Sequence, residues 1–464
     1  MVHPFPRVEA AAIDGRLHTV YHRQVQLERL CKTLIENFNE IQRAIETDAG
    51  LSEQEIAIEY HQTLSAVKRS YALLKPKEAH EGEYLIANGR NAPNNRVPAG
   101  IVYIEPTMHT LFYSAIVPLA AAMVAGNCVV LLLENNLHSL SSLLRRVLSA
   151  SLDADVFAVA SAPVKDAAFL SKSLCVLQNG ADGIPRINQI TTPAAAPVVA
   201  VVDRTADLTL AARELVAARF AFGGTSPYAP DIILVNEFHH KDFLDAVVSE
   251  SSRYRPNDNK KTTTSNFLAT LPKTSTIRQQ EPNRPIVDLS AREDILQKKA
   301  EVPILAIHGI SSLDDAIDLL TSKTAATAPL LAAYHFCSPR AGKYLSQFIH
   351  ASHTYINHIP SELLVGPAFT TTERYPLESF SLPRPVHITA PKKESGLGKK
   401  NAVVLIKEAT TPLRQYKRHP GGGIGGVGFF EQGFLINALL IVGSTVTCTG
   451  LGALWLWRWR SVGV

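Results

Sequence analysis

One short stretch constrains the local structure of this chain more than any other. It reads GGTSPYAPD over residues 223–231, and it runs directly into the apolar residues Ile232–Val235. Glycine adopts positive φ angles readily, and serine and proline are frequent in turns. The stretch therefore predicts a turn immediately before a β-strand, with Ser226 and Pro227 at the centre of the turn.

Apolar segments of two kinds alternate along the first part of the chain. Residues Gln24–Thr47 and Leu51–Leu74 carry apolar side chains at helical spacing, which predicts an N-terminal layer of helices. The short, β-rich segments Ile101–Glu105, Cys128–Leu133 and Phe157–Val159 are separated by helical segments. That alternation predicts an α/β fold with a parallel sheet.

The composition narrows the class of protein. With 464 residues, of which 46% are hydrophobic, the chain can bury more than one core. Its 46 basic and 42 acidic side chains nearly balance, and no basic tract is interleaved with aromatic residues, so no nucleic-acid partner is expected. The five cysteines are scattered without a C-x-x-C pair, so we expect buried thiols in a reducing compartment, with neither a metal site nor a disulfide framework.

The C-terminus has the composition of a membrane anchor. Residues 434–457 contain no charged side chain, and tryptophans and arginines cluster at the end of this segment. A helix needs about 20 apolar residues to cross a bilayer, and tryptophan favours the membrane interface. The glycine-rich residues 406–433 precede the segment, and no signal peptide is visible. The sequence thus predicts a flexible linker, 406–433, and a single-pass tail anchor, 434–457, with the main body in the cytosol.

Several motifs occur in the same order as in one large enzyme family. They are Pro98–Met108, Pro118–Leu131, Pro197–Leu208 and Glu301–Ile307. Together with the loop 223–231, which is similar to a Gly-Gln-x-Cys-x-Ala-Pro-Asp nucleophile loop, they make the chain resemble the aldehyde dehydrogenase superfamily. Because of its C-terminus, the chain is most similar to the membrane-anchored fatty aldehyde dehydrogenase subgroup.

The resemblance implies an aldehyde dehydrogenase-like fold with a site in the cleft between two domains. Residues 1–190 would form the N-terminal helices and a Rossmann-type nucleotide-binding domain. Residues 191–405 would form a second α/β domain of catalytic type, which contains the loop 223–231. The resemblance also implies a homodimer, NAD or NADP as cofactor, and a lipophilic small-molecule substrate.

The catalytic positions of the family carry different residues in this chain. Without a gap, the family's cysteine falls on Pro227, and a shift of one residue would place Ser226 there. The asparagine that would hold an oxyanion falls on Met108, whose thioether donates no hydrogen bond. The general-base glutamate would fall within Thr191–Ala196, which contains no carboxylate.

The cofactor positions are altered as well. The lysine that contacts the cofactor falls on Leu132, and Glu134 lies near the acidic residue of the same motif. The pyrophosphate loop is reduced to a short segment that begins at Gly180 and ends at Gly183. These two glycines and Glu134 are the candidate cofactor-binding residues.

Two functional hypotheses follow. In the first, the ancestral NAD-dependent oxidation of aldehydes is lost or repurposed, and the protein serves a membrane-associated pathway on lipophilic intermediates. In the second, the chain is an active NAD(P)-dependent dehydrogenase that oxidises a lipophilic aldehyde to an acid. It would then use Ser226, Cys128 or Cys337 in a rearranged geometry, with His109 or His335 as the nearest candidate base. Buried structural roles for these cysteines and histidines are the competing interpretation.

Overall fold

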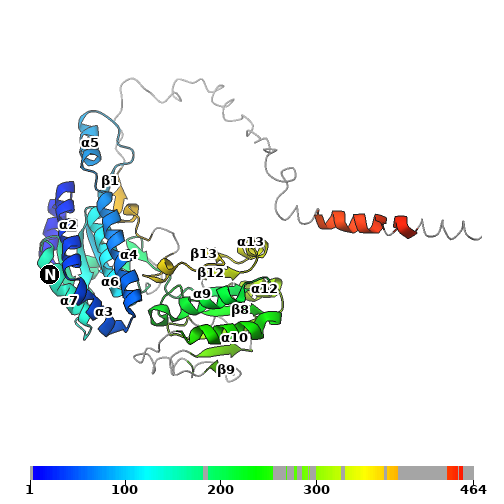
Figure 1. Cartoon of the computed structure of the whole chain (residues 1–464). Helices are drawn as coiled ribbons and strands as arrows, with labels where there is room; N and C mark the ends of the chain where they lie inside the picture. Colours follow the sequence, from blue (N-terminus) through cyan, green and yellow to red (C-terminus); the bar gives the residue numbers. More distant parts are fainter. Residues whose placement is uncertain are drawn as a thin grey trace, which may run out of the picture. The chain divides into compact units, whose positions relative to one another are not determined.

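The computed structural model divides the chain into two units, Met1–Ile388 and Thr389–Val464 (Figure 1). The described residues are 4–180, 186–253, 268, 276–279, 285–290, 292, 299–324, 330–369, 374–384, 436–447 and 449–452.

A layer of helices begins the first unit. Its members are α1 (Pro6–Asp14), α2 (Val20–Glu36), α3 (Phe38–Ala49), α4 (Glu53–Ala72) and α5 (Pro76–Ala87). The predicted helix Gln24–Thr47 is divided at Asn37, whose side-chain amide donates to the carbonyl of Thr33 at 2.8 Å and so competes with the helical backbone. Helix α4 begins with a capping box, in which Ser52 and Glu55 satisfy each other's backbone N–H groups.

A five-stranded parallel sheet follows the helical layer, in the order β4-β3-β2-β5-β6. The strands are β2 (Ile101–Glu105), β3 (Cys128–Leu132), β4 (Phe157–Ala160), β5 (Ser173–Leu177) and β6 (Gln189–Thr191). The helices between them are α6 (Leu111–Val124), α7 (Ser139–Ser151) and α8 (Ala167–Lys172). The order reverses between β2 and β5, as in doubly wound nucleotide-binding sheets. Strands predicted from the sequence at 101–105, 128–133 and 157–159 are present with small differences at their ends.

Helix α6 is the central helix of this part of the fold. Every one of its residues is buried, and it packs against both α4 and the strands β2 and β3. A helix that is apolar all round belongs inside a protein, because no face of it gains from contact with water.

A second sheet of seven strands has the order β13-β12-β7-β8-β11-β10-β9, and only β9 is antiparallel to its neighbour. Its strands are β7 (Val198–Val202), β8 (Ile232–Asn236), β9 (Thr276–Gln279), β10 (Ile286–Leu289), β11 (Leu305–Ile310), β12 (Leu330–Phe336) and β13 (Ala351–Ile356). The accompanying helices are α9 (Leu208–Phe220), α10 (His240–Ser251), α12 (Leu313–Thr324) and α13 (Pro339–Phe348). The predicted α/β class is confirmed, because both sheets are predominantly parallel and alternate with helices.

Strand β8, which the loop 223–231 enters, lies in the middle of the second sheet. Ile233 and Val235 belong to the core that includes the first sheet, whereas Ile232 and Leu234 belong to a second core with α12 and α13. The loop therefore ends at a strand that is packed on both of its faces. A short ribbon of β1 (Arg96–Pro98) and β14 (Ser381–Pro383) completes the first unit.

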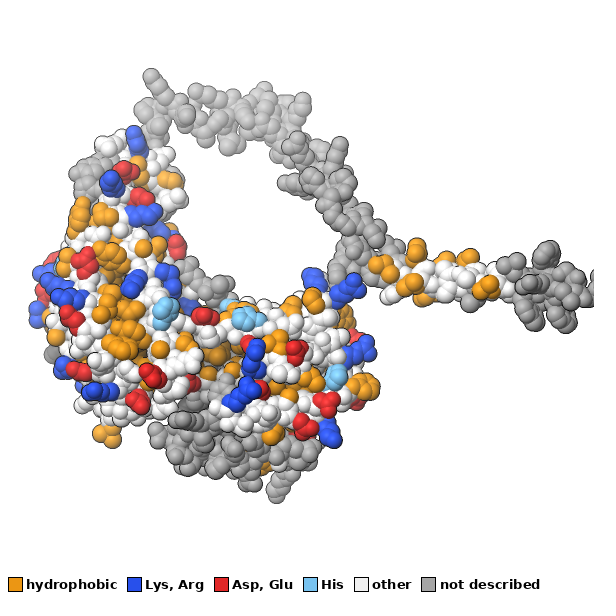
Figure 2. All heavy atoms as spheres, viewed as in Figure 1, with side chains coloured by type: hydrophobic (Ala, Val, Ile, Leu, Met, Phe, Trp, Pro, Cys, Tyr) orange, Lys and Arg blue, Asp and Glu red, His pale blue; other side chains and the backbone are white. Residues whose placement is uncertain are grey.

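The second unit is described only over residues 436–447 and 449–452, which are helical. Their apolar side chains, among them Leu439 and Ile441, are exposed to solvent (Figure 2). Within the described residues we find no helix that is both long and apolar enough to cross a membrane. The predicted linker 406–433 lies outside the described residues, as do parts of the predicted anchor 434–457.

Candidate functional site

Three consecutive left-handed residues form the entry to the loop 223–231. Phe222, Gly223 and Gly224 have φ angles of 50°, 64° and 70°. A Cβ atom on Gly224 would lie 2.5 Å from the backbone nitrogen of Pro303, so only glycine fits there. Phe222 has no such freedom, and a left-handed residue of this kind costs on the order of 1–3 kcal/mol. Its N–H donates to the carboxylate of Glu55 in α4 at 2.6 Å, which helps to hold this conformation.

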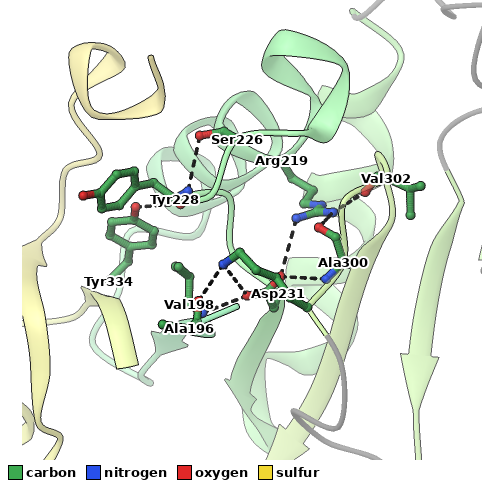
Figure 3. Close-up of polar contacts among 10 residues, drawn as sticks. Ala196, Val198, Arg219, Ser226, Tyr228, Asp231, Ala300, Val302 and Tyr334 are labelled. Atoms are coloured by element: carbon green, nitrogen blue, oxygen red, sulfur yellow. Dashed lines mark hydrogen bonds and ion pairs between the residues drawn. The ribbon is translucent and has the colours of Figure 1, made fainter. Parts of the chain in front are cut away.

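The loop ends in a buried cluster of charges (Figure 3). The carboxylate of Asp231 accepts hydrogen bonds from the N–H groups of Val198 and Ala300, at 2.8 and 3.0 Å. It also lies 3.4 Å from Nζ of Lys299 and 3.9 Å from Nη1 of Arg219. Burial lowers the pKa of Arg219 to about 10 and also lowers the pKa of Lys299. These contacts tie the end of the loop to the segment around residue 300.

Ser226 and Pro227 lie between these two fixed ends. The Ser226 hydroxyl donates to the carbonyl of Leu364 at 2.9 Å and accepts from the N–H of Tyr228 at 3.3 Å. Its side chain is buried, and Pro227 has no polar side-chain atom. The hydroxyl proton therefore points to a backbone carbonyl rather than to a base, which is the arrangement of a turn.

The two candidate residues near the start of α6 lie differently. Met108 is 55% exposed, whereas the neighbouring His109 is buried. The His109 ring reaches the loop, with Nδ1 3.0 Å from Oγ1 of Thr225 and Nε2 2.8 Å from the carbonyl oxygen of Leu364. The next residue, Thr110, has a φ of 46°. The polar side chain that faces the loop is thus His109. This residue directly follows Met108, on which the family's asparagine falls when the sequences are compared without a gap.

The candidate cofactor residues lie at the carboxyl edge of the first sheet. Gly180 follows β5 with a φ of 91°, next to Asn179, whose side chain donates to the carbonyl of Pro106 after β2 at 3.3 Å. Glu134 is exposed after β3, and Leu132 is buried at the end of that strand. Gly183 lies outside the described residues.

The two cysteines and the histidine that were considered as alternative catalytic groups are buried in strands or directly after one. Cys128 begins β3, and Cys337 directly follows β12. Burial raises the pKa of both thiols to about 12, so neither is a thiolate at neutral pH. His335 is buried in β12, and burial lowers its pKa to about 4. Among the described residues, neither of its ring nitrogens has a hydrogen-bond partner.

Another buried group, which the sequence did not single out, supports the base of α6. The Glu59 side chain from α4 is 1% exposed, and its Oε1 accepts from the N–H of Tyr113 at 3.2 Å. Burial raises its pKa to about 7, although the hydrogen bonds from the α6 backbone partly oppose this shift.

A cleft of about 730 Å³ lies beside the loop. Its walls come from α4, α6, β13 and the segments around residues 360–363 and 374–377, and they include Ala66, Val117, Ala121, Leu363, Tyr355 and Tyr375. The guanidinium of Arg374 lies 5.4 Å from the centre of the Tyr113 ring and 5.9 Å from that of Tyr228. The same group donates to the carbonyls of Leu363 and Val365, so it braces the wall of the cleft.

Sequence reasoning missed Thr225 as the partner of His109 and Arg374 as the brace of the cleft. Met108 and His109 are adjacent, and the motif does not show which of the two side chains faces the loop 223–231. Within the part of the chain that the structure describes, no three side chains are grouped as metal ligands.

Comparison with known proteins gives a consistent result. No family model matches the chain. The human protein aldehyde dehydrogenase family 3 member B1 is 25% identical over 357 residues, which is 68% of this chain and 75% of the relative. The mouse protein named aldehyde dehydrogenase, dimeric NADP-preferring, is 22% identical over 351 residues, or 68% of this chain and 77% of the relative.

Solved structures share the fold at lower identity. The substrate-bound AldH of Staphylococcus aureus has a TM-score of 0.70 and 18% identity, and the match covers 88% of this chain and 98% of that protein. A benzaldehyde dehydrogenase of Corynebacterium glutamicum has a TM-score of 0.62 and 15% identity, with coverage of 82% and 88%. The expected aldehyde dehydrogenase-like fold is therefore confirmed. The sequence relatives and this shared fold together confirm the resemblance of the chain to the aldehyde dehydrogenase superfamily.

Proposed function

We propose that this chain binds a lipophilic small molecule and does not oxidise it by the thiol chemistry of its superfamily. The observation that carries the proposal is the loop 223–231, which keeps a tightly fixed turn but offers Pro227 and a hydrogen-bonded Ser226 in place of a cysteine.

Oxidation of an aldehyde by this route begins with the attack of a thiolate on the carbonyl carbon. An unperturbed thiol has a pKa of about 8.5 and supplies some thiolate at neutral pH, whereas a serine hydroxyl needs an adjacent base. The hydroxyl of Ser226 has a carbonyl beside it instead of a base. The thiols of Cys128 and Cys337 are buried, and because burial raises their pKa to about 12, both stay protonated at neutral pH. These features support the loss of the ancestral first step.

The cleft supports a retained binding role. Small-molecule sites typically have volumes of about 300–1,000 Å³ and predominantly apolar walls with a few polar groups. The cleft beside the loop has about 730 Å³, and its aliphatic and aromatic side chains are accompanied by polar ones, among them Gln62, Arg69 and Glu362. We therefore assign the lipophilic ligand to this cleft.

NAD or NADP is the cofactor class that this fold would take, at the edge where β2 and β5 end. The residues at this edge of the first sheet fit a bound NAD or NADP only in part. Gly180 keeps the positive φ of a tight turn, but buried Leu132 supplies no cation. When bound, such a cofactor would accept a hydride, and we assign no step of this kind to the chain.

The remaining assignments are also proposals. Residues 1–190 would be the nucleotide-binding-type part and 191–405 the catalytic-type part, followed by the linker 406–433 and a membrane anchor at 434–457. The uncharged composition of the last segment supports anchoring, with the body in the cytosol. The mouse relative is named as dimeric, and this supports a homodimer.

A test of the proposal measures two properties of the full-length protein. The first is NAD(P)H formation with medium- and long-chain aldehydes, in wild type and in Ser226→Ala. The second is binding of a fluorescent fatty acid. We expect no NAD(P)H and saturable binding that is lost in Ala66→Trp, which fills the cleft, but kept in Ala57→Trp, which is exposed on the same helix.

Aldehyde turnover would refute the proposed loss of oxidation. If Ser226→Ala abolished that turnover, the serine would be the nucleophile, and if it did not, Cys337 and Cys128 would be tested next. Absence of fatty-acid binding in the wild type would refute the binding role. Flotation with vesicles, compared with a chain that ends at residue 433, tests the anchor separately, and loss of flotation is expected in the shorter chain.

A further inference from the structure

We propose that Thr225 and His109 form a hydroxyl–imidazole pair that transfers the acyl group of a lipophilic ester to water. This inference rests on the proposed binding role of the adjacent cleft and assigns a reaction to it.

The hydrogen bonds of His109 define its tautomer. A backbone carbonyl can only accept, so Nε2, which lies 2.8 Å from the Leu364 oxygen, carries the ring proton in the neutral imidazole. Nδ1 then presents its lone pair to Oγ1 of Thr225 at 3.0 Å. A base held by a third group, within hydrogen-bond reach of a hydroxyl, is the arrangement that activates an alcohol as a nucleophile.

The Thr225 hydroxyl has one proton and two acceptors within reach. One is Nδ1 of His109, and the other is the carbonyl oxygen of Phe222 at 2.8 Å. Rotation about one side-chain bond directs the proton to the imidazole, at the cost of one hydrogen bond within the loop. Thr225 is half-buried, whereas Ser226 is fully buried, so Thr225 is the more exposed of these two neighbouring residues.

Backbone strain is concentrated around the pair. Thr110 follows His109 directly, and Phe222 lies three residues before Thr225. These two residues are among three in the described part of the chain that adopt positive φ without being glycine. Residues held in such conformations gather at functional sites, because the surrounding structure must enforce them. Here Glu55 holds Phe222, which also places its ring against that of His109 at 5.9 Å.

The reaction balances without an oxidant or a metal. Oγ1 of Thr225 forms a bond to the acyl carbon of the ester while its proton passes to Nδ1 of His109. The carbon–oxygen bond to the alcohol then breaks, and the alkoxide leaves with that proton. Water next attacks the acyl-threonine, again giving its proton to Nδ1, and the fatty acid is released as the threonine oxygen recovers a proton.

The position of the cleft supports an ester with a long acyl chain. Tyr228, three residues after Thr225, lines the cleft, and so does Leu363, which precedes the Leu364 carbonyl that His109 contacts. An acyl chain that lies in the cleft with its carbonyl at the Tyr228 end would bring that carbonyl to the loop.

The experiment uses full-length protein and two p-nitrophenyl esters, the acetate and the octanoate. We expect hydrolysis of the octanoate in preference to the acetate, with a loss of at least about tenfold in Thr225→Ala and in His109→Gln. Thr225→Ser should retain activity, because it keeps the hydroxyl. Cys31→Ser, which alters a half-buried thiol on α2, is the control and should hydrolyse both esters at the wild-type rate.

A fluorophosphonate probe should add its mass to the peptide that contains Thr225, and His109→Gln should prevent this labelling.

Two results would overturn the inference. One is hydrolysis that survives in Thr225→Ala, and the other is a probe adduct on Ser226 or on a cysteine. Thermal unfolding of every variant separates loss of chemistry from loss of fold. Binding of the fluorescent fatty acid is measured in parallel. Binding without hydrolysis refutes only this reaction, whereas absence of binding refutes the proposed function as well.

Discussion

The buried carboxyl of Glu59 should make the stability of this protein depend on pH, and Glu59→Gln should remove that dependence. Glu59 is 1% exposed and accepts a hydrogen bond from the Tyr113 N–H at the start of α6. Because burial disfavours the charged form, the pKa of Glu59 rises from 4.5 to about 7. Glutamine keeps an oxygen for the same N–H and has no charge to bury.

The sign of the effect follows from the direction of the shift. A pKa that is higher in the folded than in the unfolded state gives stability that is present below pH 4.5 and is lost as the pH rises to about 7. Each pKa unit corresponds to about 1.4 kcal/mol, so ionised Glu59 should cost the folded wild type on the order of 3 kcal/mol above pH 7. The variant should therefore be the more stable protein at pH 8, and the difference should shrink toward pH 5.

Urea unfolding of wild type and Glu59→Gln, at several pH values between 5 and 8, measures this difference. Glu46→Gln, on an exposed position of α3, is the matched control and should leave the pH dependence unchanged. The reasoning would be refuted by a stability difference that is independent of pH, or by a variant that is less stable than wild type at pH 8. The first result would mean that Glu59 does not titrate between pH 5 and 8, and the second that the carboxylate stabilises α6 more than its burial costs.

Two further predictions concern the ends of the loop 223–231. Asp231→Asn should lower the free energy of unfolding by about 3–5 kcal/mol, because it leaves Arg219 and Lys299 buried beside a neutral group, and urea unfolding checks this. Asp231→Glu, which keeps the charge, should cost less, and an equal cost for both would contradict the role of charge. Gly224→Ala should destabilise the protein by at least about 1 kcal/mol, because its Cβ would overlap Pro303 in a left-handed residue, and thermal unfolding measures the loss. Gly82→Ala, where nothing lies within reach of a Cβ, is the control and should not lower the unfolding temperature.

Much of the fold could be predicted from the sequence, because local composition dictates it. The strands Ile101–Glu105 and Cys128–Leu132 are continuous apolar runs, and such runs gain most when they are buried on both faces of a parallel sheet. The start of α4 follows from the capping pair Ser52 and Glu55, which lie three residues apart. The break at Asn37 was not predicted, since it depends on a competition between one side-chain amide and the helical backbone.

The candidate site was predicted only in part. The sequence located the loop 223–231 and the lack of a cysteine within it, which are properties of residue type and order. It did not predict that His109, rather than Met108, would face Thr225, because the direction of each side chain in the segment before α6 depends on the backbone conformation there. It gave no indication of Glu59 beneath α6, since a glutamate in an amphipathic helix is usually exposed.

The sequence by itself determined the resemblance to a known superfamily, the alternation of strands and helices, and the absence of a thiol from the loop. Only the tertiary structure decided which side chains meet there. Thr225 and His109 are far apart in the chain, and their 3.0 Å contact requires the two sheets, α4 and the Leu364 carbonyl to be in place at once. Local propensities act over a few residues, whereas the protonation and reach of a side chain depend on the burial and hydrogen bonds that only the packed chain provides.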